Sequence, residues 1–182
     1  MRAAKTFLVV VLVVGLAAGL WALFSLYSEV KELRSIRQMP AAPAPAQQGQ
    51  EYATIFLVKA EPTEFHLVPV QRKLGGPATP QAALQALING PLAHEELFAS
   101  VPASVQLRSL TIQDGLATAD FSSEIVKDFN GGALLESYLV TAIVNTLAEF
   151  PQIQQVQILV EGEAVESIGG HILVSKPLSR GR

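Results

Sequence analysis

The stretch QDGLATADFSSE, residues 113–124, holds the densest group of side chains in this sequence that could do chemistry. Two carboxylates, Asp120 and Glu124, lie close to two hydroxyls, Ser122 and Ser123. A hydrolytic site can be built from such groups, but it needs a base or a second partner held nearby. The same residues suit a strand that ends by capping a helical turn, with Ser122 or Asp120 accepting free backbone N–H groups. We expect the structural role and no catalytic residue.

The histidines do not complete a catalytic or metal-binding motif. The sequence contains only His66, His94 and His171, and their spacing matches no zinc motif. His171 follows Gly169 and Gly170, so this Gly-Gly-His segment is a candidate ligand surface. Cysteine is absent, which excludes a catalytic thiol, a disulfide framework and a lipoprotein anchor. The sequence therefore predicts no metal and no cofactor.

An apolar segment near the N-terminus predicts a membrane anchor. Residues 7–27 contain no charged side chain, and a helix of that length spans about 30 Å, the thickness of a bilayer's hydrocarbon core. A cleaved signal peptide is the alternative, but its apolar region is usually shorter and is followed by a small-residue cleavage site. We predict an uncleaved single-pass anchor after a short cytoplasmic head, residues 1–6, with the C-terminal part outside. The basic residues on the two sides of the segment are nearly balanced, so they orient it only weakly.

Composition divides the remaining chain into a connector and a domain. Residues 28–50 predict a juxtamembrane helix followed by a linker rich in proline and alanine. Residues 51–182 are expected to form one domain with a net charge of −6, whereas residues 1–50 carry +3. An acidic domain without a Lys/Arg cluster is a poor nucleic-acid binder.

Alternating and helical periodicities predict the fold of this domain. The expected strands are 54–60, 64–74, 105–113, 116–121 and 155–163, and the expected helices are 80–90 and 133–150. This order predicts an α+β fold, with two helices packed on one face of a mixed, mostly antiparallel sheet. Pro69 inside the second strand favours an edge position or a bulge, because proline donates no ladder hydrogen bond. A short, irregular strand is a further option near the C-terminus.

The helix predicted at 133–150 is apolar nearly all round. Its only charged residues are Glu136 and Glu149, and Val140 and Val144 belong to a second apolar stripe. A surface helix is normally polar on its outer half. Either a second layer of the same chain covers this stripe, which we expect, or the stripe meets another protein. Val140 and Val144 are therefore also candidate interface residues.

Several short motifs occur in one order along the domain. They are LINGP (87–91), Val101-Pro102, ADFS (119–122), IVNTLAEFP (143–151), VQILVEG (156–162) and IGGHI (168–172). Together they resemble the GerMN domain of sporulation and spore germination proteins of the GerM type, over roughly residues 52–178. Many members have two copies of the module or a lipoprotein cysteine, whereas this chain has one copy and an apolar segment.

The resemblance implies a membrane-tethered, extracytoplasmic binding or scaffold module of the bacterial envelope rather than an enzyme. Its expected partners are another protein or a cell-wall component, with a homo-oligomer as a further option. The alternative is a cell-wall hydrolase or its direct accessory, with Asp120, Glu124 and His171 in a cleft. The candidate ligand or interface residues are Asp120, Ser122, Val140, Val144, Gly169, Gly170 and His171.

Overall fold

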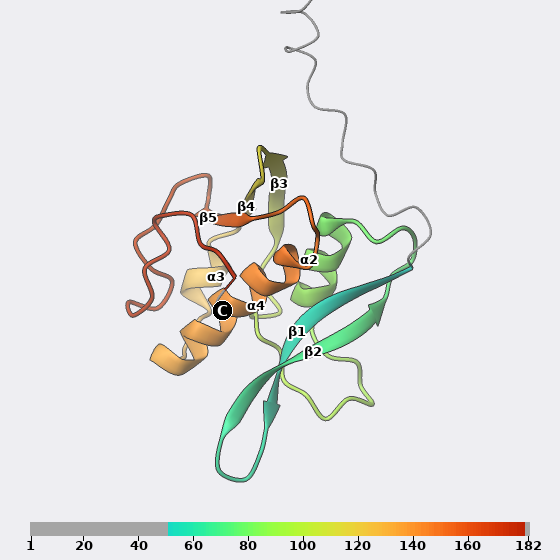
Figure 1. Ribbon diagram of the computed structural model, residues 1–182. Coiled ribbons are helices and arrows are strands. Elements are labelled where there is room, and N and C mark those ends of the chain that lie inside the picture. The colour runs from blue at the N-terminus through green and yellow to red at the C-terminus, as the bar shows by residue number, and fades with distance from the viewer. Residues whose placement is uncertain (1–50, 181–182) are drawn as a thin grey trace, which may run out of the picture. The chain divides into compact units, whose positions relative to one another are not determined.

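The computed structural model describes residues 51–180 (Figure 1). The elements are β1 (Tyr52–Ala60), β2 (Phe65–Lys73), α2 (Pro80–Asn89), β3 (Leu107–Gln113), β4 (Leu116–Phe121), α3 (Glu124–Lys127), α4 (Ala133–Ala148) and β5 (Gln155–Val160). This order agrees with the sequence prediction, including the single helical turn after residue 121. The α+β class is confirmed.

The first two strands form an antiparallel ribbon with Tyr52 opposite Lys73 and Ala60 opposite Phe65. Pro69 lies opposite Phe56, and Val58, two residues further along β1, directs its backbone N–H and carbonyl away from β2 to Phe98. Along an antiparallel ladder, the backbone N–H and C=O groups of successive residues point alternately toward the partner strand and away from it. Phe56 therefore points away from β2, like Val58, and the position of the missing N–H of Pro69 faces the outer edge of β2. The predicted edge position of this strand is therefore confirmed.

Helix α2 begins and ends as its sequence predicts. The Thr79 hydroxyl accepts the Ala82 N–H at 3.1 Å, and Pro80 occupies the first turn, where its missing donor costs nothing. Gly90 ends the helix at φ 75°, a conformation that glycine adopts without steric cost.

Strands β3, β4 and β5 make a second sheet with β4 in the centre. Asp114 (φ 50°) and Gly115 (φ 83°) form the tight turn of the β3–β4 hairpin, as Asp-Gly predicts. The chain then passes through α3 and α4 and returns as β5, which pairs with β4 in parallel. Up to residue 180, the last one described, the chain after the β5 turn forms an isolated bridge between Leu178 and Val156 and no further strand.

Helices α2 and α4 contact each other and both sheets, so the core lies around this helix pair. In the β3–β4–β5 sheet, the buried side chains belong to β4 and β5. In the β1–β2 ribbon, β1 is buried along most of its length. The sequence predicted a single mixed sheet with two helices on one face. That prediction is wrong about the number of sheets, because the described strands form two separate ones. The sheets stay separate because residues outside the strands occupy their inner edges: Phe98 bonds to Val58 of β1, and Leu178 to Val156 of β5.

Within residues 51–180, no helix is long and apolar enough to cross a membrane. The predicted anchor at 7–27, the head at 1–6 and the connector at 28–50 lie outside the described residues.

Candidate functional site

The structure places Asp120 at the end of β4, where it stabilises a turn. Its side chain is almost fully buried, and its carboxylate accepts the Gly162 N–H at 2.8 Å. The guanidinium of Arg108 lies 3.3 Å from Asp120 and 3.0 Å from Glu161. Glu161 and Gly162 both have positive φ in the turn after β5. Asp120 therefore fastens this turn to the neighbouring strand.

The predicted helix cap after β4 is wrong in detail. The residue that precedes α3 is Ser123, and it makes no side-chain capping bond. The Ser122 hydroxyl instead accepts the backbone N–H of Gln106 at 3.0 Å, and the Ser122 N–H donates to the Gln106 carbonyl. Ser122 thus extends the β3–β4 pairing by one residue. Its hydroxyl accepts a backbone N–H from across the hairpin and not one from the helical turn that follows.

We expect Asp120→Asn to lower the free energy of unfolding by about 1 kcal/mol, because the amide keeps the bond to Gly162 but loses the charge facing Arg108. Urea denaturation measures the loss. Asp114→Asn is the matched control, since asparagine tolerates the positive φ of that position. The same pair of variants tests the hydrolase alternative: peptidoglycan turnover that Asp120→Asn abolishes and Asp114→Asn retains would show that Asp120 is catalytic.

The Gly-Gly-His segment surrounds the side chain of Glu136, which belongs to the first turn of α4 and is fully buried. One carboxylate oxygen accepts the N–H groups of Ile168 (3.0 Å) and Gly169 (2.8 Å). The other accepts the His171 N–H at 2.8 Å and lies 3.1 Å from His171 Nδ1. Successive backbone N–H groups that converge in this way form an anion-binding nest. Here the anion belongs to the protein itself.

Local geometry explains why two glycines precede His171. A Cβ atom on Gly169 would lie 2.4 Å from a ring carbon of Phe129 and 3.1 Å from the Glu136 carboxylate. Gly170 has a φ of 90°, a conformation that other residues rarely adopt. The segment can therefore close around Glu136 only with glycine at these positions.

The charge of Glu136 is stabilised despite its burial. Burial alone would raise the pKa of this carboxyl. The N–H groups of Gly169, His171 and Ile172, together with the His171 ring, outweigh burial and lower the pKa below its ordinary value. Through these bonds Glu136 anchors the segment after β5, and the ligand role expected for residues 169–171 stays a prediction. Sequence reasoning passed over Glu136, although a lone acid in the middle of an apolar run was the available signal.

The second apolar stripe of α4 is buried within the chain. Val140 and Val144 are only 5% and 4% exposed, so neither lies on a surface that a partner could reach. The expectation that the chain itself covers this stripe is confirmed, and the candidate interface role of the two valines is wrong. The reason is that α4 contacts β1, β5 and α2 together.

A groove opens instead beside the N-terminal end of α4. It has a volume of about 140 Å³. It is lined by Val58, Ala99, Ser100, Pro102, Asp128, Phe129, Asn130, Gly131, Leu135 and Tyr138. Leu135 is 43% exposed. Phe98, 58% exposed, is the cross-strand partner of Val58, and such partners project to the same face. We call this set, with Phe98, the α4 groove.

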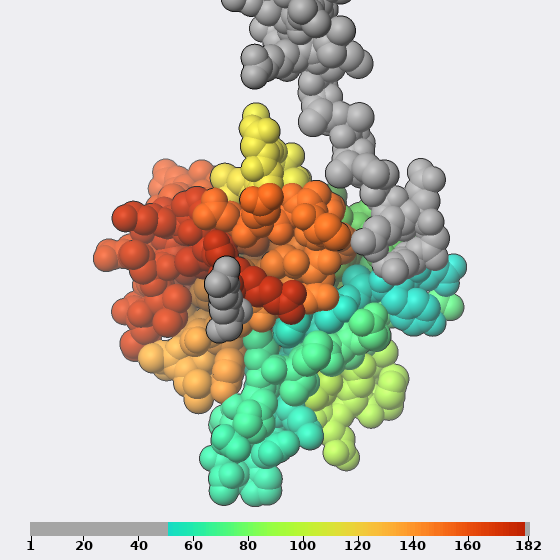
Figure 2. All heavy atoms as spheres, viewed as in Figure 1, coloured from blue at the N-terminus to red at the C-terminus, as the bar shows by residue number. Residues whose placement is uncertain are grey.

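Segments far apart in sequence meet at the α4 groove. The Tyr138 hydroxyl donates to the Phe65 carbonyl, which joins α4 to the start of β2. Asp128, which also lines the groove, accepts the Ser104 hydroxyl. In Figure 2, α4 (orange) reaches the surface between the segment that follows β5 (red) and the β1–β2 ribbon (cyan to green). None of Asp120, Glu124 and His171 lines the groove, so the cleft that the hydrolase alternative requires is not this one.

The family described as Germane, sporulation and spore germination, matches residues 54–166, more than half of the chain. The chain belongs to the Germane family. The matched range begins at the third residue of β1, ends in the region after β5 and includes the other four strands in full. The resemblance to GerMN domains that the short motifs indicate is thereby confirmed.

Solved structures share the Germane fold of this chain. The first GerMN domain of the sporulation protein GerM from Bacillus subtilis is 25% identical, with a TM-score of 0.58, and the match covers 72% of this chain and 98% of that one. The tandem GerMN domains of the same protein match at 23% identity and a TM-score of 0.59, over 79% of this chain and 50% of that chain. A candidate lipoprotein from Clostridium perfringens matches at 24% identity and a TM-score of 0.55, over 76% of this chain and 93% of that chain. A search of curated proteins found no match.

Proposed function

We propose that this Germane-family chain is a membrane-anchored, extracytoplasmic binding module of the bacterial envelope that serves sporulation or spore germination. The family assignment supports the process, and the likeness to a candidate lipoprotein supports an envelope location. The anchor is the apolar segment at 7–27. The proposal assigns no catalytic step to the domain.

The α4 groove is the observation that carries the binding role. Leu135 lines the groove and is 43% exposed, and Phe98, the bridge partner of the groove residue Val58, is 58% exposed beside it. Exposed apolar side chains that gather around a hollow, rather than scatter singly, are typical of interaction sites. Meanwhile Asp120 and Glu136 are committed to turns and loops of the fold.

The chemistry of the groove indicates the kind of partner it binds. Its volume of about 140 Å³ suits one or two apolar side chains rather than a whole helix face or a sugar chain. Asp128 lies in its wall, and the domain as a whole is acidic. The partner is therefore a protein segment that presents an apolar side chain next to a basic residue, held against Phe98 and Leu135.

Site-specific photocrosslinking in the producing cells tests this proposal. A photoreactive phenylalanine analogue at Phe98 is expected to give a discrete adduct in the membrane fraction, which mass spectrometry identifies. Ile112 on β3, 40% exposed, is the matched control position, since it is apolar and accessible but does not line the groove.

The companion measurement uses Leu135→Glu, which places a charge at the groove while the Phe98 probe stays in place. We expect this change to remove the adduct at Phe98, with the protein level unchanged. An adduct that forms equally at Ile112, or that persists undiminished with Leu135→Glu, would show that the α4 groove is not the binding site. Failure to obtain any adduct at Phe98 would count against the binding role itself.

A further inference from the structure

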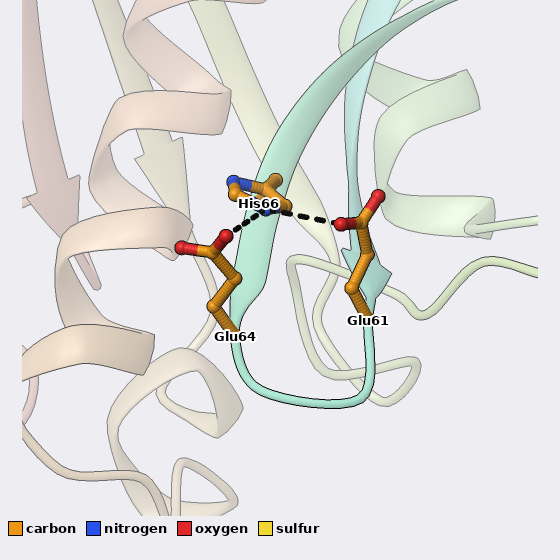
Figure 3. A group of neighbouring side chains, drawn as sticks. All are labelled: Glu61, Glu64 and His66. Atoms are coloured by element: carbon orange, nitrogen blue, oxygen red, sulfur yellow. Dashed lines mark ion pairs between the residues drawn. The ribbon is translucent and has the colours of Figure 1, made fainter.

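The tip of the β1–β2 ribbon brings together three side chains that sequence spacing did not connect. Glu61 and Glu64 flank the turn, and His66 is the second residue of β2 (Figure 3). One ligand atom from each lies within 4.8 Å of the others. The ribbon tip projects from the rest of the domain, so a small ion reaches these side chains freely (Figures 1 and 2).

The backbone holds the three residues in place. The Glu61 N–H donates to the Glu64 carbonyl at 2.8 Å and closes the turn, in which Pro62 fixes φ. Ala60 pairs with Phe65 and Lys59 with His66, so the antiparallel register sets the position of the histidine relative to both glutamates. The cluster thus depends on regular hairpin geometry and not on an irregular loop.

The arrangement around the imidazole is poorly explained by ion pairing alone. A single nitrogen, His66 Nε2, faces Glu64 Oε1 at 3.3 Å and Glu61 Oε2 at 3.6 Å. Both distances exceed the usual 2.7–3.2 Å of an N–H···O hydrogen bond, and one N–H can point at only one of the two oxygens. Two carboxylates therefore lie near one nitrogen atom, and that nitrogen makes a short hydrogen bond with neither of them.

The same distances suit a shared cation. Around a tetrahedral zinc ion with bonds of about 2.0–2.1 Å, neighbouring ligand atoms lie about 3.3 Å apart. Two edges of such a tetrahedron are already near that length, and the two glutamates need only a side-chain rotation to complete the third. The Lys59 ammonium lies 3.2 Å from the other Glu61 oxygen, Oε1, and so orients Oε2 toward His66. Ligating carboxylates in metal sites are commonly oriented by a hydrogen bond from an outer partner of this kind.

We propose that Glu61, Glu64 and His66 bind a divalent transition-metal cation of the zinc type at the ribbon tip, with water in the remaining coordination position. The donor set decides the metal class, because imidazole suits zinc, copper and nickel, whereas calcium and magnesium prefer oxygen ligands alone. The site is separate from the α4 groove and does not depend on the binding role proposed for it.

Isothermal titration of the purified full chain with zinc chloride tests the site, and calcium chloride is the comparison cation. His66→Gln and Glu64→Gln are expected to weaken zinc binding at least tenfold, since even the loss of an orienting partner costs about 10–100-fold. Both side chains are exposed, and the turn is closed by backbone atoms, so these variants keep the fold. Circular dichroism confirms that they do.

His94→Gln is the matched control, because His94 is exposed and lies outside the cluster. Zinc binding that survives in His94→Gln, is lost in His66→Gln and Glu64→Gln, and has no calcium counterpart supports the site. The absence of zinc binding to the unaltered chain overturns it. Equal binding to the unaltered chain and to His66→Gln also overturns it, because the zinc must then bind elsewhere.

Discussion

Glu136→Gln is expected to lower the free energy of unfolding by about 3 kcal/mol, since it replaces an acceptor of several buried hydrogen bonds by a group that is partly a donor. The carboxylate accepts the N–H groups of Ile168, Gly169 and His171. A glutamine offers one carbonyl oxygen to these donors and turns its NH₂ group toward the rest. At least one buried N–H group then loses its partner.

Urea denaturation of the purified protein measures this loss. Glu163→Gln is the matched control, because Glu163 is exposed in the turn after β5 and its removal is expected to change stability by less than about 0.5 kcal/mol. We also expect increased amide hydrogen exchange at 168–172 in Glu136→Gln, because the segment loses its anchor. Equal stability of the two variants would show that the nest contributes nothing to folding.

The pH dependence gives the same contact an independent signature. The pKa of Glu136 is lower in the folded protein than its ordinary value of about 4.3, so the folded state binds the proton less readily than the unfolded chain. Its stabilising effect is complete above that ordinary value and is lost as the pH falls through the folded-state pKa. The difference in stability between the unaltered protein and Glu136→Gln should therefore be constant at neutral pH and shrink below about pH 4.3. A difference that stays constant down to pH 3 would contradict the assignment.

Arg72→Ala is expected to destabilise the protein by about 3–5 kcal/mol, because it leaves a largely buried carboxylate without its charged partner. The Arg72 side chain is 8% exposed and its Nη2 donates to Glu95 at 2.8 Å. Glu95 also accepts the Leu92 N–H at 2.7 Å, and this bond, followed by Arg72, lowers the pKa of Glu95. The pair ties β2 to the loop that follows α2.

Lys73→Ala is the control for Arg72→Ala. Lys73 is the next residue of β2, and its pair with Glu51 is exposed on both sides, so its loss should cost less than about 1 kcal/mol. Thermal denaturation of the two variants, each beside the unaltered protein, measures the contrast.

A second variant separates pairing from burial at Arg72. Its Nε and Nη1 atoms are buried without a hydrogen-bond partner in the described part of the chain, so the pair is imperfectly satisfied. Arg72→Met combined with Glu95→Gln removes both charges and keeps the volume. We expect this double variant to be more stable than Arg72→Ala, since replacing a whole buried pair costs less than breaking it. A double variant that is less stable than Arg72→Ala would show that the charges themselves are required.

Local signals in the sequence predicted the elements of this domain. Asp114-Gly115 specified the β3–β4 turn through its positive φ angles, and Thr79-Pro80 specified the start of α2 through capping. These signals act over a few residues, so they hold whatever the rest of the chain does. The short motifs between 87 and 172 were likewise sufficient to indicate the family.

Only the tertiary structure decided which elements meet. The division into two sheets depends on Phe98 and Leu178 reaching strand edges from distant parts of the chain. The burial of Val140 depends on three elements that pack around α4. No periodicity encodes such contacts, because they arise from the combined packing of elements far apart in sequence.

For the polar residues too, the sequence determined their identity and spacing, and the tertiary structure determined their partners. The sequence by itself determined that this chain carries an acidic Germane-family domain without cysteine, and that Gly169 and Gly170 precede His171. Tertiary packing decided that Glu136, and no external ligand, occupies the nest at those glycines, and that Glu61 and Glu64 converge on His66. The physical reason is that a side chain's charge and shape are local properties, whereas its partner is set by the path of the whole backbone.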